Sequence, residues 1–262
     1  FNGDDIREEA RIQALKEIAS QISVDVSASF EKVTTEHNLS LDEFTQSVII
    51  TRVDNNLPNI ENVAIYEDNN RYYFLTRLSK IKYYETIEKH RRNAVRTAVG
   101  LLSKAESEFN SQSLRYLSEA MNEIAPYMNV PIQEEYPEGS GEIVNLYSYI
   151  KLLAYTFIDQ FNLIPDQKKI ELKIGFTRDT SLGIKVVDNN NNPIEKVPVY
   201  SYIDENDKGP FALTDAKGNC IFPVPKVTDD QPLQYVNFEV NVDEMIKSAQ
   251  LFGALPKIKA QS

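Results

Sequence analysis

From Lys169 onward, the apolar residues recur at every second position in short runs that are separated by turn-forming residues. This spacing lets a β-strand bury one face, because successive side chains of a strand point to opposite sides. Six such runs at regular turn spacing favour two sheets packed on each other. We therefore expect residues 168–262 to form a small all-β sandwich. The expected strands are Ile170–Phe176, Leu182–Asp188, Val197–Ile203, Phe211–Leu213, Cys220–Val224 and Val236–Val242.

Two connections in this region carry clear turn signals. The stretch from Asp188 to Pro193 is almost entirely Asn and predicts a tight turn. The stretch from Thr214 to Asn219 places Gly218 where the backbone needs a left-handed residue, a conformation that glycine adopts without steric cost.

Residues 80–165 have the three-to-four spacing of amphipathic helices. We expect one helix after Ser79 and a second, antiparallel to it, after the polar stretch 110–113. A third helix should begin after Ser140, which can cap it, and end before Pro165. The two prolines and two glycines of Val130–Gly141 predict a linker or long loop. The seam of the first helix is Tyr84, Ile87, Ala94, Ala98, Leu101 and Ala105, broken by Arg91. The seam of the second is Leu114, Leu117, Met121 and Ile124, and that of the third is Ile143, Tyr147, Ile150, Ala154, Phe157 and Phe161.

Residues 1–79 contain both the three-to-four spacing of helices and the two-residue alternation of strands. They predict an α+β domain with an antiparallel sheet, and residues 80–165 are expected to pack on this domain. Asp5–Ile22 should form a helix whose Ala10, Ala14 and Ile18 lie on one face against the sheet. Asp68-Asn69-Asn70 suits the turn of a hairpin. A short helix is expected after Ser40. The expected strands are Ser23–Glu31, with Val24, Val26 and Phe30 toward the helix, then Val48–Val53, Val63–Glu67 and Arg71–Leu78.

Two segments carry a family resemblance. EARIQALKEIASQISVDVSASFE, followed by RYYFLTRLSKIKYYETI, resembles the LPP-twenty lipoprotein family of bacterial envelopes over roughly residues 1–110. The N-terminal domain of flagellar assembly protein T is similar in the same places, but less closely. The resemblance implies a signal peptide, lipidation at a cysteine upstream of Phe1 that is absent from this chain, and a location in the periplasm or at the outer membrane surface.

The C-terminal region carries a second resemblance. VVDNNNNPIEKVPVYSYI and the later ALTDAKGNCIFPV are similar to bacterial immunoglobulin-like domains. Such domains serve as spacers or adhesive modules, and their motif residues shape turns, so the resemblance implies no chemistry.

Composition narrows the possible functions. The formal charge of −11 opposes the phosphate backbone, so nucleic-acid binding is not expected. No apolar run reaches the roughly 18 residues of a membrane span, so membrane contact is expected only through the lipid anchor. The single cysteine, Cys220, excludes an internal disulfide and favours a buried small side chain. The chain begins at Phe1 without an initiator Met, from which we expect that removal of a leader peptide, or trimming of the chain, has taken away what preceded it.

The sequence predicts no catalytic, cofactor-binding or metal-ligating residue. His37 and His90 lie in different elements without metal-binding spacing, and the hydrolase, NTPase and dehydrogenase motifs are absent from the sequence. The acidic stretch Asp204–Gly209 lacks the final glutamate of a calcium loop. Tyr200 and Tyr202, on one face of an expected strand, are the candidate ligand-binding residues, although tyrosines at this spacing more often cover a half-buried sheet. The paired carboxylates are Glu134/Glu135, Asp204/Asp207 and Asp229/Asp230.

We expect a non-catalytic envelope lipoprotein, or a periplasmic assembly component, that acts through contacts with envelope proteins. One alternative is a glycan- or peptide-binding module that uses the C-terminal sandwich. Another is an enzyme with an unrecognised carboxylate site, which would need two acidic groups converging in a cleft.

Overall fold

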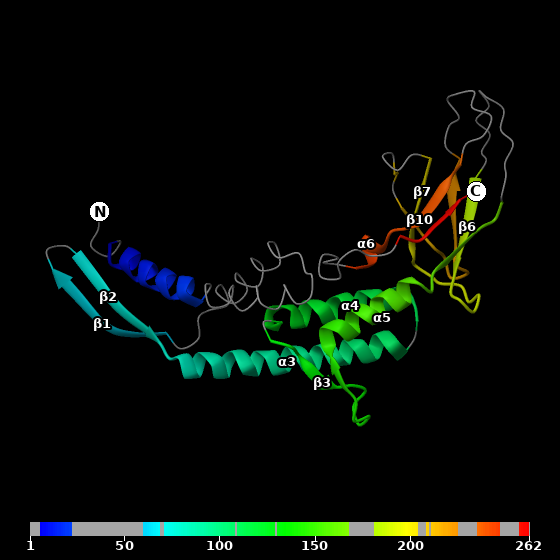
Figure 1. Cartoon of the computed structure of the whole chain (residues 1–262). Helices are drawn as coiled ribbons and strands as arrows, with labels where there is room; N and C mark the ends of the chain where they lie inside the picture. The colour runs from blue at the N-terminus through cyan, green and yellow to red at the C-terminus, as the bar shows by residue number, and fades with distance from the viewer. Residues whose placement is uncertain are drawn as a thin grey trace.

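The structure is a computed structural model, which describes residues 6–22, 60–68, 71–107, 109–128, 130–167, 181–203, 208–209, 211–224, 235–246 and 257–261. The molecule is elongated (Figure 1). The N-terminal helix and hairpin lie at one end, three helices form the middle, and two β-sheets lie at the other end. The described residues thus follow the predicted order of an α+β part, a helical part and an all-β part.

The N-terminal part contains a helix over residues 6–22 and an antiparallel hairpin. The hairpin consists of β1 (Ile60–Asp68) and β2 (Arg71–Leu78), and its register shifts between Asn62 and Ala64. Both elements confirm the sequence prediction, and the expected stripe of Ala10, Ala14 and Ile18 is half-buried. The expected strands Ser23–Glu31, with Phe30, and Val48–Val53 lie outside the described residues.

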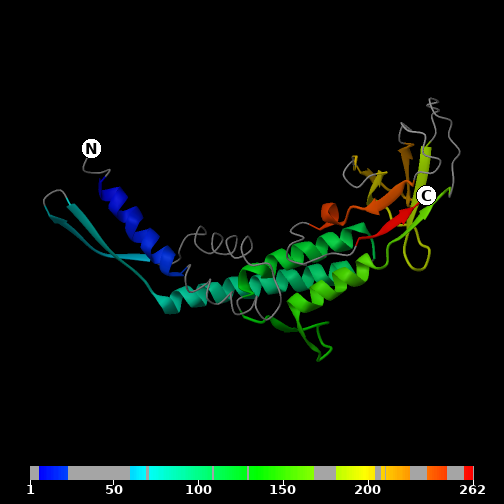
Figure 2. The ribbon, with the colours of Figure 1, turned by 45° about the horizontal axis from the view of Figure 1, so that its top comes forward.

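The helical layer is built around small side chains. Helix α3 (Lys80–Ser107) and helix α4 (Ser111–Ile124) run in opposite directions (Figures 1 and 2). Buried alanines on α3 let α4 approach closely and bury its own leucines and isoleucine. Helix α4 begins where the Asn110 side chain accepts a hydrogen bond from the Gln112 backbone N–H at 2.8 Å. A short 3₁₀ helix, η1 (Ala125–Tyr127), follows it.

The expected loop and third helix differ from the prediction. Strands β3 (Gln133–Glu135) and β4 (Ile143–Asn145) form a small hairpin. Strand β3 lies within the expected loop, whereas β4 occupies the expected start of the third helix. Helix α5 (Leu146–Ile158) therefore begins after Asn145 and not after Ser140, because the Asn145 side chain accepts from the Ser148 N–H at 3.1 Å. Ile143, assigned to the helix seam, lies on β4 and is 63% exposed. Helix α5 also ends earlier than expected, before a strand at 162–165.

The C-terminal part contains two sheets. One has the strand order β5-β6-β9 and the other β11-β10-β7-β8. Every expected strand within the described residues is present, whereas Ile170–Phe176 lies outside them. Strands β5 and β11 were not predicted. The bounds are β5 Asn162–Pro165, β6 Ser181–Val187, β7 Pro198–Tyr202, β8 Ala212–Leu213, β9 Asn219–Pro223, β10 Asn237–Val240 and β11 Lys259–Gln261.

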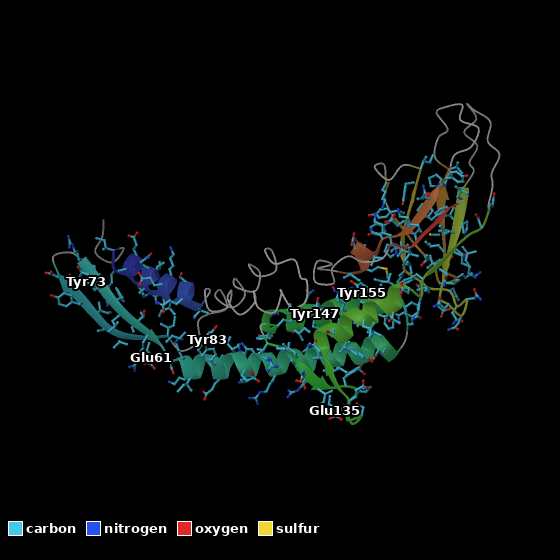
Figure 3. All side chains as sticks on the ribbon, viewed as in Figure 1. Glu61, Tyr73, Tyr83, Glu135, Tyr147 and Tyr155 are labelled. Atoms are coloured by element: carbon cyan, nitrogen blue, oxygen red, sulfur yellow. The ribbon has the colours of Figure 1, made fainter. Side chains whose placement is uncertain are left out.

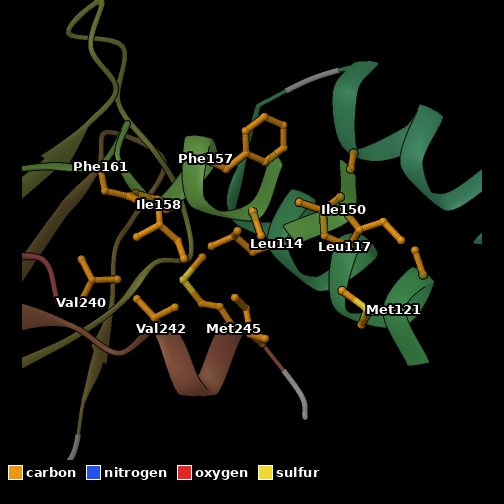
Figure 4. Close-up of a cluster of buried hydrophobic side chains, with 14 of the residues drawn as sticks. Leu114, Leu117, Met121, Ile150, Phe157, Ile158, Phe161, Val240, Val242 and Met245 are labelled. Atoms are coloured by element: carbon orange, nitrogen blue, oxygen red, sulfur yellow. The ribbon is translucent and has the colours of Figure 1, made fainter. Parts of the chain in front are cut away.

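The two sheets share a core. Phe222 on β9 and Phe238 on β10 meet across it, with ring centroids 5.8 Å apart. A short helix, α6 (Val242–Met245), follows β10 and places its side chains near Leu114 of α4 and Ile158 of α5 (Figure 4). One continuous hydrophobic core therefore joins the two-sheet part to the helical layer.

The two predicted turns of the C-terminal part are confirmed. Gly218 has a φ of 76°, and a Cβ at this position would collide with the Val186 carbonyl oxygen. The Asp215 carboxylate accepts hydrogen bonds from the backbone N–H groups of Lys217 and Asn219, which fixes the turn. The Asp188 carboxylate plays the same part in the Asn-rich turn by accepting from Asn190 and Asn192.

Candidate functional site

The outer face of the four-stranded sheet gathers polar and aromatic side chains. Val199 on β7 and Phe238 on β10 are fully buried in the core between the sheets. Because side chains alternate along a strand, Tyr200, Tyr202 and Glu239 lie on the opposite, outer face. Glu239 pairs with Tyr200 on β7 and with Lys259 on β11, so residues from three strands meet there.

Glu239 is the centre of this cluster. Its carboxylate accepts a hydrogen bond from the Tyr202 hydroxyl at 2.6 Å, and it lies 2.9 Å from Lys208 Nζ and 3.5 Å from Lys259 Nζ. Burial raises the pKa of Glu239, but the Tyr202 hydrogen bond and the two lysines outweigh it, so the net pKa is lowered. The glutamate is therefore a buried, compensated anion.

The two tyrosines predicted as ligand-binding residues lie together but do not form an open aromatic platform. Tyr202 is only 2% exposed, and the Lys208 and Lys259 ammonium groups lie 4.8 and 5.9 Å from its ring centroid. Burial raises the Tyr202 pKa, with a further contribution from Glu239. Tyr200 is half-buried: its hydroxyl accepts from Asn241 Nδ2 at 2.9 Å. Tyr200 is therefore the more solvent-accessible tyrosine of this pair.

A second polar cluster fastens the β3–β4 hairpin to α3. The Glu106 carboxylate accepts hydrogen bonds from the hydroxyls of Tyr136 and Tyr149, the latter at 2.7 Å. The two rings meet edge to face at 5.3 Å. Burial first, and then Glu106, raises the pKa of both hydroxyls, and that of Tyr149 reaches about 12. Three residues so far apart in sequence give no sequence signal, and the cluster was not predicted.

The remaining chemical candidates do not assemble. Cys220 is buried, and burial raises its thiol pKa to about 12, as expected of a structural cysteine. Glu135 accepts a hydrogen bond from the Gly141 N–H at 2.7 Å within its own hairpin. His37, Asp204–Asp207 and Asp229/Asp230 lie outside the described residues. The described ranges contain no group of three or more His, Cys, Asp or Glu residues that could hold a metal ion.

The N-terminal hairpin has one exposed apolar face, which we call the hairpin outer face. Tyr66 and Tyr73 are cross-strand partners with ring centroids 6.0 Å apart, and Leu75 lies on the same face beside Ala64. Tyr66, Tyr73 and Leu75 are 63, 51 and 59% exposed. An ion pair of 2.8 Å between Glu61 and Arg77 borders this face (Figure 3).

This hairpin belongs to the part of the chain that matches a known family. The family model of the LPP20 lipoprotein matches residues 2–79, which include the helix over residues 6–22 and the hairpin through Leu78. The match confirms the LPP-twenty resemblance for the N-terminal region, and it indicates a lipoprotein of the bacterial cell envelope. No curated protein and no solved structure matches the chain significantly. No helix in the described part of the chain is long and apolar enough to cross a membrane.

Proposed function

We propose that this protein is a non-catalytic lipoprotein of the bacterial envelope, tethered by an N-terminal lipid and acting through contacts with other envelope proteins. The observation that carries the proposal is the hairpin outer face, which lies within the region matched by the family model. Large apolar side chains gathered on one exposed face of a small hairpin favour a partner, because burying them removes apolar area from water.

The chemistry of this face specifies the kind of partner. Tyrosine combines a large apolar ring with a hydroxyl, and it is enriched at the centres of protein interfaces. The Glu61–Arg77 pair on the rim can exchange its partners for charges on another protein. The face therefore fits an apolar patch with a polar rim on an envelope protein.

Site-specific crosslinking in cells tests this proposal. A photo-crosslinking phenylalanine analogue at Tyr73 of the full-length protein is expected to form a covalent adduct with a defined envelope protein, identified by mass spectrometry. The matched control is the same analogue at Tyr235, which is similarly exposed but lies in the two-sheet part. Equal adducts at both positions, or none at Tyr73, would contradict a specific interface on the hairpin.

We also infer that the C-terminal part is an immunoglobulin-like module. Two facing sheets with a shared Phe222–Phe238 core and the Asp215–Gly218 turn support this inference. A second candidate function, the binding of a glycan or peptide, is favoured by Tyr200, whose half-buried ring stands edge to face with Phe211 at 6.1 Å. Binding through this surface would use Tyr200 and not the covered Tyr202.

A further inference from the structure

The charge of the chain is distributed unevenly. The whole chain carries −11, yet residues 80–96 of α3 contain six lysines and arginines against two glutamates. We call these residues the basic half of α3. Lys82, Lys89, Arg92 and Arg96 are exposed, and at about 100° per residue they lie on the side of the helix opposite its buried alanines.

Several of these cations have no counter-ion among the residues that the structure describes. Glu88 pairs with Arg91 at 3.3 Å and with Arg92 at 3.5 Å, and Glu61 reaches Lys82 at 3.8 Å. Among the described residues, Lys80, Lys89 and Arg96 form no ion pair. The basic half of α3 therefore keeps an excess of exposed positive charge.

The β3–β4 hairpin carries the opposite charge. Residues 133–145, which we call the acidic arm, contain four glutamates and no lysine or arginine. Glu138 and Glu142 are exposed, and none of the four forms an ion pair with a described residue. The arm projects from the helical layer beside α3, where Figure 3 marks Glu135 (Figures 1 and 3). Because the Tyr136 hydroxyl of the arm donates a hydrogen bond to Glu106, the arm is fastened to the C-terminal half of α3.

Gly100 lies between the two charged regions. A glycine inside a helix costs about 0.5–1 kcal/mol relative to alanine, and apart from neighbouring atoms of its own helix, no atom lies within 4 Å of the position that a Gly100 Cβ would occupy. Packing against the described residues therefore does not require glycine here. Ser103 and Ser107, which follow on this side, are also small and exposed, while the exposed Lys104 lies at its edge. A second helix can therefore approach closely along the serines.

We propose that the exposed side of α3 binds a second copy of this chain, with the two α3 helices antiparallel about a two-fold axis near Gly100. Arg92 and Glu106 are separated by about 21 Å along the helix at 1.5 Å per residue, and Gly100 lies close to their midpoint. An antiparallel pair centred there places Arg92 opposite the partner's C-terminal half. The acidic arm of each copy then meets the basic half of the other, and the two-fold axis repeats this contact.

Screening allows this local attraction to overcome the net repulsion between two chains of −11. At physiological ionic strength the Debye length is about 8 Å, so charges in contact interact while those far from the interface are largely screened. Contact between glutamates and unpaired cations is favourable in this regime. The dimer should therefore weaken as salt is raised above the physiological concentration.

Sedimentation equilibrium of the 262-residue chain over a range of concentrations tests the proposal. The wild type is expected to dimerise. One variant reverses the charge of the basic half of α3 with Lys89→Glu, Arg92→Glu and Arg96→Glu. A second reverses the charge of the acidic arm with Glu138→Lys and Glu142→Lys. Each variant should raise the dissociation constant of the dimer at least about tenfold. Lys196→Glu with Lys217→Glu, exposed cations of the two-sheet part, is the control and should leave the dimer unchanged. Circular dichroism confirms that each variant is folded.

Mixing the two reversed variants gives the decisive result. Each variant repels itself, but the acidic arm of one matches the basic half of α3 in the other, so the mixture should recover a heterodimer. Gly100→Leu should weaken the wild-type dimer by filling the space at the axis. A monomer at all concentrations, or a dimer insensitive to both reversals, overturns the proposal. A monomer that binds anionic phospholipid vesicles through Lys89, Arg92 and Arg96 also overturns it, in favour of a membrane surface.

Discussion

Phe238→Ala is expected to lower the free energy of unfolding by about 3–5 kcal/mol, the typical cost of truncating a fully buried phenylalanine. Phe238 is completely buried between the two sheets and meets the Phe222 ring at 5.8 Å. The lost ring leaves a cavity that the surrounding strands can only partly fill. Denaturant unfolding, followed by circular dichroism, measures the loss.

Ile221→Ala is the matched control for this prediction. Ile221 lies on β9 next to Phe222, but its side chain faces outward and is mostly exposed. Its truncation should change the free energy of unfolding by less than about 0.5 kcal/mol. Similar losses from the two substitutions would show that the outer face of this sheet is also covered, and would contradict the placement of the core between the sheets.

Glu239→Leu is expected to destabilise the protein by about 2–3 kcal/mol, because it leaves the Tyr202 hydroxyl and two lysines without their acceptor. The loss should be smaller than that from a fully buried ion pair, because the Lys208 and Lys259 side chains remain 25 and 33% exposed and can turn toward water. Denaturant unfolding at neutral pH measures it. The control is Glu195→Leu, a substitution at an exposed glutamate in the same part of the chain.

The contribution of Glu239 to the free energy of unfolding should decrease as the pH falls into the acidic range. The folded-state pKa of Glu239 lies below its ordinary value of about 4.5. A carboxylate with a lowered folded-state pKa contributes fully above its unfolded-state pKa and loses this contribution as pH falls through the folded-state value. The stability difference between wild type and Glu239→Gln should therefore be constant near neutral pH and shrink below about pH 4.5. A difference that grows on acidification would contradict the lowered pKa.

The sequence predicted the regular elements well because their periodicity follows directly from burial. The two-residue alternation of Leu182–Asp188 and the alanine spacing on α3 each leave one consistent packing face. The third helix was misplaced because Ile143 happens to continue the seam of α5. The side chain of Asn145, two residues later, caps the true start of the helix. A local cap thus decided the boundary, and periodicity did not.

The polar clusters could not be predicted because they depend on tertiary proximity. Alternation along β10 places Glu239 and Phe238 on opposite faces of the sheet. Only the tertiary fold brings the Lys208 and Lys259 ammonium groups to the Glu239 carboxylate. The net charge of −11 likewise conceals the basic half of α3, because a sum over the whole chain loses the positions of the charges. Tyr200 and Tyr202 were correctly placed on one face, but their different burial follows from neighbours that the sequence does not order in space.

Mass spectrometry of the N-terminal peptide from the full-length protein, isolated from fractionated cells of its bacterial host, tests the envelope-lipoprotein assignment most directly. We expect the protein to be recovered with the membranes and its N-terminal residue to be a cysteine carrying acyl chains. Recovery in the cytosol with an unmodified N-terminal peptide would contradict it.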